Sequence, residues 1–124
     1  MTSRADRNKE LAVQGFREFA AGNYEVLRTL LHEDFVEHSP DNPSGRDAFI
    51  EHIISAPVAK AELDLRRVIA DDEHVVMHYR MTTPDDERGV AVVDIWRLVD
   101  DQIVEHWDVL QSVPDSVRTP NGMF

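Results

Sequence analysis

Apolar residues recur at helical spacing in the first part of the chain. The pattern over residues 4–21 predicts an amphipathic helix that ends at Gly22. A second helix is expected over residues 24–32, and a third from residue 44 until Pro57 interrupts it. Residues 35–38 read as a short extended segment before a turn rich in proline, aspartate and asparagine.

The pattern then changes to segments rich in valine, isoleucine and aromatic residues, which is typical of strands. The four expected strands are residues 61–70, 74–82, 90–99 and 102–110. Their short polar connections favour antiparallel hairpins, and the tail from Pro114 carries no regular pattern. Three helices followed by a run of strands predict one α+β domain over residues 1–124, with the helices packed on one face of a curved sheet.

Composition narrows the range of functions. The 124 residues contain 13 Lys+Arg and 24 Asp+Glu, a formal charge of −11, and no cysteine. An acidic chain without a basic cluster is a poor ligand for nucleic acid or an anionic membrane surface. The absence of cysteine excludes disulfides and cysteine-ligated metal centres. With no apolar run long enough for a membrane span and a polar start, we expect a cytoplasmic protein.

Ionisable residues interrupt the apolar faces of the last three expected strands. Side chains two positions apart share a strand face, so Asp94 lies on one face with Val92 and Trp96. An unpaired carboxylate is costly to bury, and the usual response is a partner or a raised pKa. We therefore expect these faces to line one cavity. The ionisable side chains expected there are Asp94, Asp108, His78 and His106, with His38 at the mouth and Arg80 available for an anionic group or a rim salt bridge.

This set of side chains suits proton transfer. A carboxyl or imidazole whose pKa approaches neutrality can remove a proton next to a carbonyl, while a second group stabilises the enolate oxygen. Enolisation of this kind needs no cofactor. Six histidines invite a metal site, but the sequence has neither His-Glu-x-x-His nor His-x-His, and no Gly-x-Ser-x-Gly elbow. We predict neither a metal nor a cofactor. The same residues also admit a purely structural interpretation, as hydrogen-bonded groups of the core.

Four segments carry a resemblance to a known family. They are Val92 to Leu98 (VVDIWRL), Gln102 to Gln111 (QIVEHWDVLQ), Phe35 to Pro40 (FVEHSP) and Asn121 to Phe124 (NGMF). The chain resembles SnoaL-like polyketide cyclase domains over nearly its whole length. The resemblance implies a cystatin-like cone, in which a bent antiparallel sheet and three helices enclose a deep pocket. Ketosteroid isomerases, limonene-epoxide hydrolase, scytalone dehydratase and many non-catalytic binding domains share that cone.

The resemblance also suggests roles for three residues. Asp108 matches the acid/base carboxylate of the cyclases, His38 falls where ketosteroid isomerases carry their base, and Asp94 falls where they keep a protonated acid. The chain departs from the isomerases because it has Gly15-Phe16 where they supply a phenol, and His38 where they supply a carboxylate. The arrangement of limonene-epoxide hydrolase is not matched, since Arg97 lies on the strand face opposite Asp94.

Three functions remain open at this point. The first is cofactor-independent acid/base catalysis, either isomerisation or aldol cyclisation, on a small hydrophobic carbonyl substrate, with Asp108 as principal acid/base and the other ionisable groups assisting. The second is a non-catalytic small-molecule-binding domain of the same fold, and the third is an interaction domain with a collapsed pocket. The apolar substrate-binding walls expected are Phe16, Phe35, Val92, Trp96 and Leu110.

The opposite sheet face is too apolar to remain in water, so we expect a homodimer through it. Its expected residues are Val75, Met77, Tyr79, Val93, Ile95, Trp107 and Val109.

Overall fold

Three α-helices and one 3₁₀ helix occupy the first half of the chain in a computed structural model that describes residues 2–116 and 118–124. They are α1 (Arg4–Ala20), α2 (Val26–Leu30), α3 (Arg46–Ile53) and the 3₁₀ helix η1 (Pro57–Lys60). Ser3 caps the N-terminus of α1: its hydroxyl accepts a hydrogen bond from the backbone N–H of Asp6 at 3.0 Å and satisfies a free donor of the first turn.

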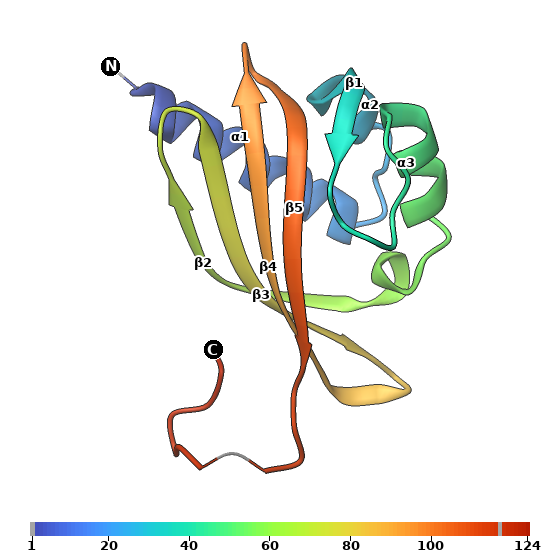
Figure 1. Cartoon of the computed structure of the whole chain (residues 1–124), viewed down its shortest axis with the longest axis vertical. Helices are drawn as coiled ribbons and strands as arrows, with labels where there is room; N and C mark the ends of the chain where they lie inside the picture. The colour runs from blue at the N-terminus through green and yellow to red at the C-terminus, as the bar shows by residue number, and fades with distance from the viewer. Residues whose placement is uncertain (1, 117) are drawn as a thin grey trace.

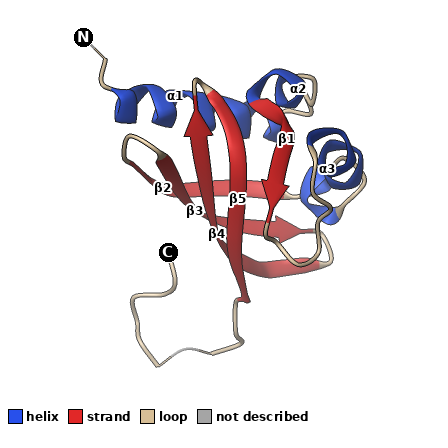
Figure 2. Ribbon diagram, turned by 45° about the horizontal axis from the view of Figure 1, so that its top comes forward, coloured by secondary structure: helices blue, strands red, loops and turns tan. Residues whose placement is uncertain are grey.

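Five strands form one sheet in the order β1-β5-β4-β3-β2. They are β1 (Leu31–Glu37), β2 (Glu62–Ala70), β3 (His74–Thr83), β4 (Asp86–Val99) and β5 (Gln102–Ser112). The four later strands pair antiparallel, whereas β1 runs parallel to β5 at the sheet edge. Helices α1, α2 and α3 cover one side of the curved sheet (Figures 1 and 2), with α1 against β2 and β3 and α3 against β1. The predicted α+β cone is confirmed.

Several element boundaries differ from the prediction, and two of these differences extend the sheet. Helix α2 is shorter than expected because Leu31 and His32 already belong to β1, which pairs with β5. Strand β4 begins at Asp86, inside the segment expected to be a loop, because the β3–β4 hairpin keeps pairing through polar residues. Gly89 permits this, since its φ of +78° suits glycine and a Cβ there would meet the carbonyl of Met81.

The inner face of the sheet packs under the helices and forms the core. On β3 this face carries Val75, Met77 and Tyr79, which are buried, because Met77 pairs with Asp94 and Tyr79 with Val92 across β4. These three residues were expected on the outer face, and that part of the prediction is wrong. The outer face instead carries Val76, His78, Arg80, Val93, Ile95, Arg97, Glu105, Trp107 and Val109.

Helix α1, the longest described, lacks the length and the apolar run that a bilayer crossing requires, and the other described helices lack them as well.

Candidate active site

A cavity of about 620 Å³ lies between the helices and the inner face of the sheet. Of the walls expected from the sequence, Phe16, Val92, Trp96 and Leu110 line it. Phe35 does not line it, because its ring is buried beneath the site and packs against Phe49 with centroids 4.9 Å apart. The volume is typical of a small-molecule site, so the pocket is not collapsed around its side chains.

His106 is the centre of a buried network at one end of the cavity. Its Nδ1–H donates to the carboxylate of Glu37 at 2.8 and 3.0 Å, and its Nε2–H donates to Asp94 Oδ1 at 2.9 Å. The indole of Trp96 stacks on the imidazole with centroids 3.8 Å apart. The ring is therefore held on both edges and one face, with His106 only 2% exposed and Asp94 5% exposed.

The network keeps His106 protonated. Burial alone lowers the pKa of an imidazole, but the hydrogen bonds and charges of Asp94 and Glu37 outweigh it and raise the pKa of His106 to about 9. The same contacts hold the pKa of Glu37 below its usual value, although its burial acts in the opposite direction. Stacking on Trp96 favours the imidazolium further, since an indole face attracts a cation.

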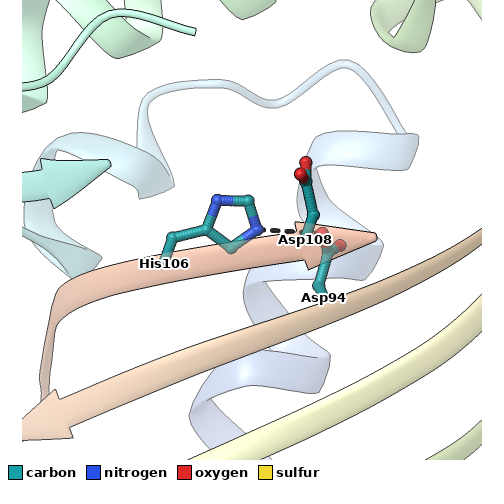
Figure 3. A group of neighbouring side chains, drawn as sticks. All are labelled: Asp94, His106 and Asp108. Carbon is teal, nitrogen blue, oxygen red and sulfur yellow. Dashed lines mark hydrogen bonds and ion pairs between the residues drawn. The ribbon is translucent and has the colours of Figure 1, made fainter. Parts of the chain in front are cut away.

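Asp108 lies beside this network and lines the cavity. It pairs with Asp94 across β5 and β4, and Asp94, His106 and Asp108 each offer a ligand atom within 4.8 Å of the others. Figure 3 shows the three side chains rising from these neighbouring strands. Burial raises the pKa of Asp108, as do the carboxylates of Asp94 and Glu37, while Ser39 and His106 act the other way. A raised pKa makes this carboxyl group a stronger base than an ordinary aspartate, which favours proton exchange with a ligand.

Glu37 belongs to the site and was missed in the sequence. Its carboxylate also accepts hydrogen bonds from the backbone N–H of Ser39 at 3.0 Å and from the side-chain amide of Asn42 at 3.3 Å. A signal for it was available, because Glu37 lies two positions after the buried Phe35 and therefore shares its strand face.

His38 points away from the cavity, contrary to expectation. Its Nε2 lies 2.7 Å from Glu105 Oε2, and its ring stacks on Trp107 with centroids 4.9 Å apart. The cause is the alternation of β1, which directs Glu37 inward and its neighbour outward.

His78 and Arg80 also lie outside the cavity, on the outer face of β3. The imidazole of His78 contacts Arg67 and stacks on Phe124 with centroids 5.5 Å apart. The guanidinium of Arg80 lies 5.3 Å from the centroid of the Phe124 ring, and its Nε–H donates to the carbonyl of Arg88 at 2.8 Å. The expected convergence therefore holds for Asp94, His106 and Asp108 and fails for His38, His78 and Arg80.

Tyr79 adds a phenol to the cavity wall from β3. Its ring packs edge-on against Phe16 with centroids 5.0 Å apart, and the residue is buried. Burial and the nearby carboxylate of Asp94 raise the pKa of Tyr79 well above its usual value. The phenol therefore keeps its proton, and its hydroxyl is directed to the carboxylate of Asp94.

The same cluster has the composition of a possible metal site. Asp94, His106 and Asp108 have ligand atoms close enough to share one ion. A metal, however, would have to displace the proton on Nε2 of His106, and the rise in the pKa of this imidazole opposes that loss. The donor set fits proton sharing better than metal binding.

The fold and the site together define a cone-shaped α+β protein with paired carboxylates and an imidazole inside an apolar pocket. A family model described as SnoaL-like domain matches residues 12–106, and the chain belongs to this family. A search of curated protein sequences found no significant match.

Solved structures share the fold at low sequence identity. A candidate ketosteroid isomerase from Kribbella flavida DSM 17836 is 20% identical with a TM-score of 0.79, and the match covers 98% of this chain and 88% of that one. A steroid delta-isomerase from Pseudomonas aeruginosa is 22% identical with a TM-score of 0.68, covering 85% and 80%. A candidate SnoaL-like polyketide cyclase from Jannaschia sp. CCS1 is 19% identical with a TM-score of 0.68, covering 89% of each chain. At these identities the likeness shows the fold alone.

Proposed function

We propose that the protein is a cofactor-independent acid/base catalyst that enolises a small hydrophobic carbonyl compound, leading to isomerisation or aldol cyclisation. One observation carries the proposal: Asp108 and Asp94 face each other in a mostly apolar cavity, and of these two aspartates it is Asp94 that pairs with the buried imidazolium of His106. Asp108 is thus the carboxylate free to meet a substrate. Membership of the SnoaL-like family, together with isomerase and cyclase structures that share the fold, supports the same class of chemistry.

In the proposed reaction Asp108 acts as the general base. Its carboxylate takes a proton from the carbon next to the substrate carbonyl, and the electron pair moves onto the carbonyl oxygen to give an enolate. In an isomerisation, Asp108 returns the proton to a different carbon of the same molecule. In a cyclisation, the enolate carbon attacks a second carbonyl, and the new alkoxide oxygen receives the proton.

The remaining groups stabilise the enolate oxygen. The phenol of Tyr79 is a neutral donor on the cavity wall beside Asp94. Asp94 accepts the Nε2–H of His106, so a proton can reach the developing oxyanion through Asp94 while Glu37 holds the other edge of the ring. Preorganised donors of this kind act strongly in a cavity that excludes water.

The experiment uses α-proton exchange, which requires no knowledge of the natural substrate. A panel of hydrophobic ketones, such as 2-tetralone and 2-decalone, is incubated with the protein in D₂O, and deuterium uptake at the α carbon is followed by NMR. We expect uptake above the buffer rate with the wild type and a loss of about 10²–10⁴-fold in Asp108→Asn. Asp85→Asn, at the exposed β3–β4 turn, is the matched control. Equal rates for wild type and Asp108→Asn would exclude the role of Asp108.

A non-catalytic binding domain of the same fold is the alternative, and the complete pairing of His106 favours it. Both imidazole nitrogens already have carboxylate partners in the unliganded protein, as a structural core group would. On this alternative, Asp108→Asn changes ligand affinity only and no ketone exchanges its α protons above the buffer rate.

We also propose that the protein is cytoplasmic and that two copies pair through the outer face of the sheet. On this face the side chain of Val109 is 68% exposed, and its neighbours Trp107, Ile95 and Val93 are partly buried. An apolar surface of this kind is costly to leave in water.

A further inference from the structure

The side chains that line the cavity can carry more negative than positive charge. Among the described residues, its lining contains three aspartates and two histidines and no lysine or arginine. Asp94, His106 and Asp108 line one end of the cavity, called its closed end because Asp94 and His106 are buried there, and Glu37 is bound behind His106. Asp41 and His52 are exposed residues elsewhere on the lining. When these groups are ionised, the closed end holds three negative charges against the one positive charge of His106.

The arginines near the sheet cannot correct this imbalance. Arg66 and Arg80 lie over the ring of Phe124 on the other side of the sheet, and Arg97 donates to Glu105 there. The residue that the sequence offered for an anionic substrate group is therefore absent from the cavity. A carboxylate or phosphate placed beside Asp108 would meet a like charge and lose its hydration without gaining a partner.

The aromatic walls of the cavity also favour a cationic ligand over an anionic one. Phe16, Trp96 and Tyr79 present aromatic surface to the cavity, and aromatic faces attract cations. An ammonium group at the closed end would meet the unpaired carboxylate of Asp108, whereas an uncharged group would meet the phenol of Tyr79.

We infer that the cavity selects hydrophobic ligands by charge: it binds ammonium compounds most tightly, uncharged compounds less tightly, and carboxylates most weakly. The substrate is then a carbonyl compound without an anionic group. The statement about the substrate rests on the proposed function. The order of binding is a property of the cavity itself and does not require that any reaction takes place.

The test compares three ligands of one shape: 1-adamantylamine, 1-adamantanol and 1-adamantanecarboxylate, at pH 7.4, where the first and last are charged. Dissociation constants are measured by isothermal titration calorimetry with the 124-residue protein. We expect the amine to bind about tenfold or more tightly than the alcohol, and the carboxylate at least about tenfold more weakly, because one unit charge near Asp108 is worth more than 1.4 kcal/mol in a partly buried site.

Two variants test whether Asp108 causes the preference for the amine. Asp108→Asn should reduce the advantage of the amine over the alcohol to less than about threefold, whereas Asp85→Asn at the exposed turn should leave all three constants unchanged. A carboxylate that binds the wild type as tightly as the alcohol overturns the inference, and so does failure of all three to bind. Failure of the ketone exchange with the binding order intact would instead reject only the proposed catalysis.

Discussion

Asp94 and Asp108 lie directly opposite each other on β4 and β5, and both side chains face the cavity. Two carboxylates in this position repel each other unless one is neutralised. His106 neutralises Asp94 by donating from Nε2 at 2.9 Å, and Asp108 is left with a raised pKa. This division gives two chemically identical side chains different roles, one held as part of a buried network and the other available to a ligand.

Asp108→Asn should stabilise the protein while removing the proposed activity. Because burial and neighbouring carboxylates raise the pKa of Asp108, ionisation of this group costs folding free energy once the pH exceeds its usual value. A neutral asparagine removes that cost, as is common where a functional group is held in an unfavourable place. Urea unfolding at pH 7.5 should give a higher midpoint for the variant. A lower midpoint would mean that Asp108 is part of the structural network.

His106→Gln should destabilise the fold strongly. Removing the imidazolium leaves Glu37 and Asp94 buried without their cation, and the loss of one partner of a buried ion pair costs about 3–5 kcal/mol. His38→Gln is the matched control, because this histidine also binds a glutamate but at the surface, where such pairs contribute less than about 1 kcal/mol. The free energies of unfolding are compared by urea titration. Similar losses in the two variants would contradict the buried network.

Stability should decline in mildly alkaline solution. His106 has a folded-state pKa of about 9 and an ordinary value of 6.5, so the folded protein binds more protons than the unfolded chain between these limits. The contribution of the network is therefore complete below about pH 6.5 and is lost as the pH rises through about 9. The difference in unfolding free energy between wild type and His106→Gln, measured from pH 6 to pH 10, should narrow along this range. A constant difference would show that His106 is neutral in the folded state.

The proposed dimer should depend on the outer face of the sheet. Light scattering at micromolar concentration should give twice the monomer mass, and Val109→Asp should shift it to the monomer, because a charge at this exposed apolar position opposes association. Ile54→Asp is the control, since this exposed apolar residue lies at the end of α3, on the helix side of the sheet. A monomeric wild type would contradict the proposal.

The strand alternation predicted the central cluster but not every member of it. Asp94, His106 and Asp108 could be placed on common faces from the sequence, because alternation within a strand is fixed by backbone geometry. The prediction that His78 faces the cavity was wrong because alternation defines two faces for each strand without saying which one is buried. The register between neighbouring strands decides which faces lie together on the inner side of the sheet. The more apolar alternate face of β3, with Val75, Met77 and Tyr79, was the better candidate for the core.

The first strand shows a second limit of sequence reasoning. The segment around Phe35 could be recognised as extended, but its parallel pairing with β5 depends on contacts between residues far apart in the chain. That pairing brings Glu37 next to His106 and turns His38 to the opposite side. The resemblance to ketosteroid isomerases favoured His38, whereas alternation from Phe35, which the structure shows to be buried, would have indicated Glu37.

The most direct measurement is a titration of the Asp108 side-chain carboxyl by ¹³C NMR in protein labelled at aspartate, with Asp108→Asn used to assign the signal. We predict a pKa above the ordinary aspartate value of 3.8, and a fall of that pKa on replacing Asp94 with asparagine, because the neighbouring charge is removed. A pKa at or below 3.8, unchanged in Asp94→Asn, would mean that water solvates Asp108 and that the paired carboxylates do not form a proton-transfer site.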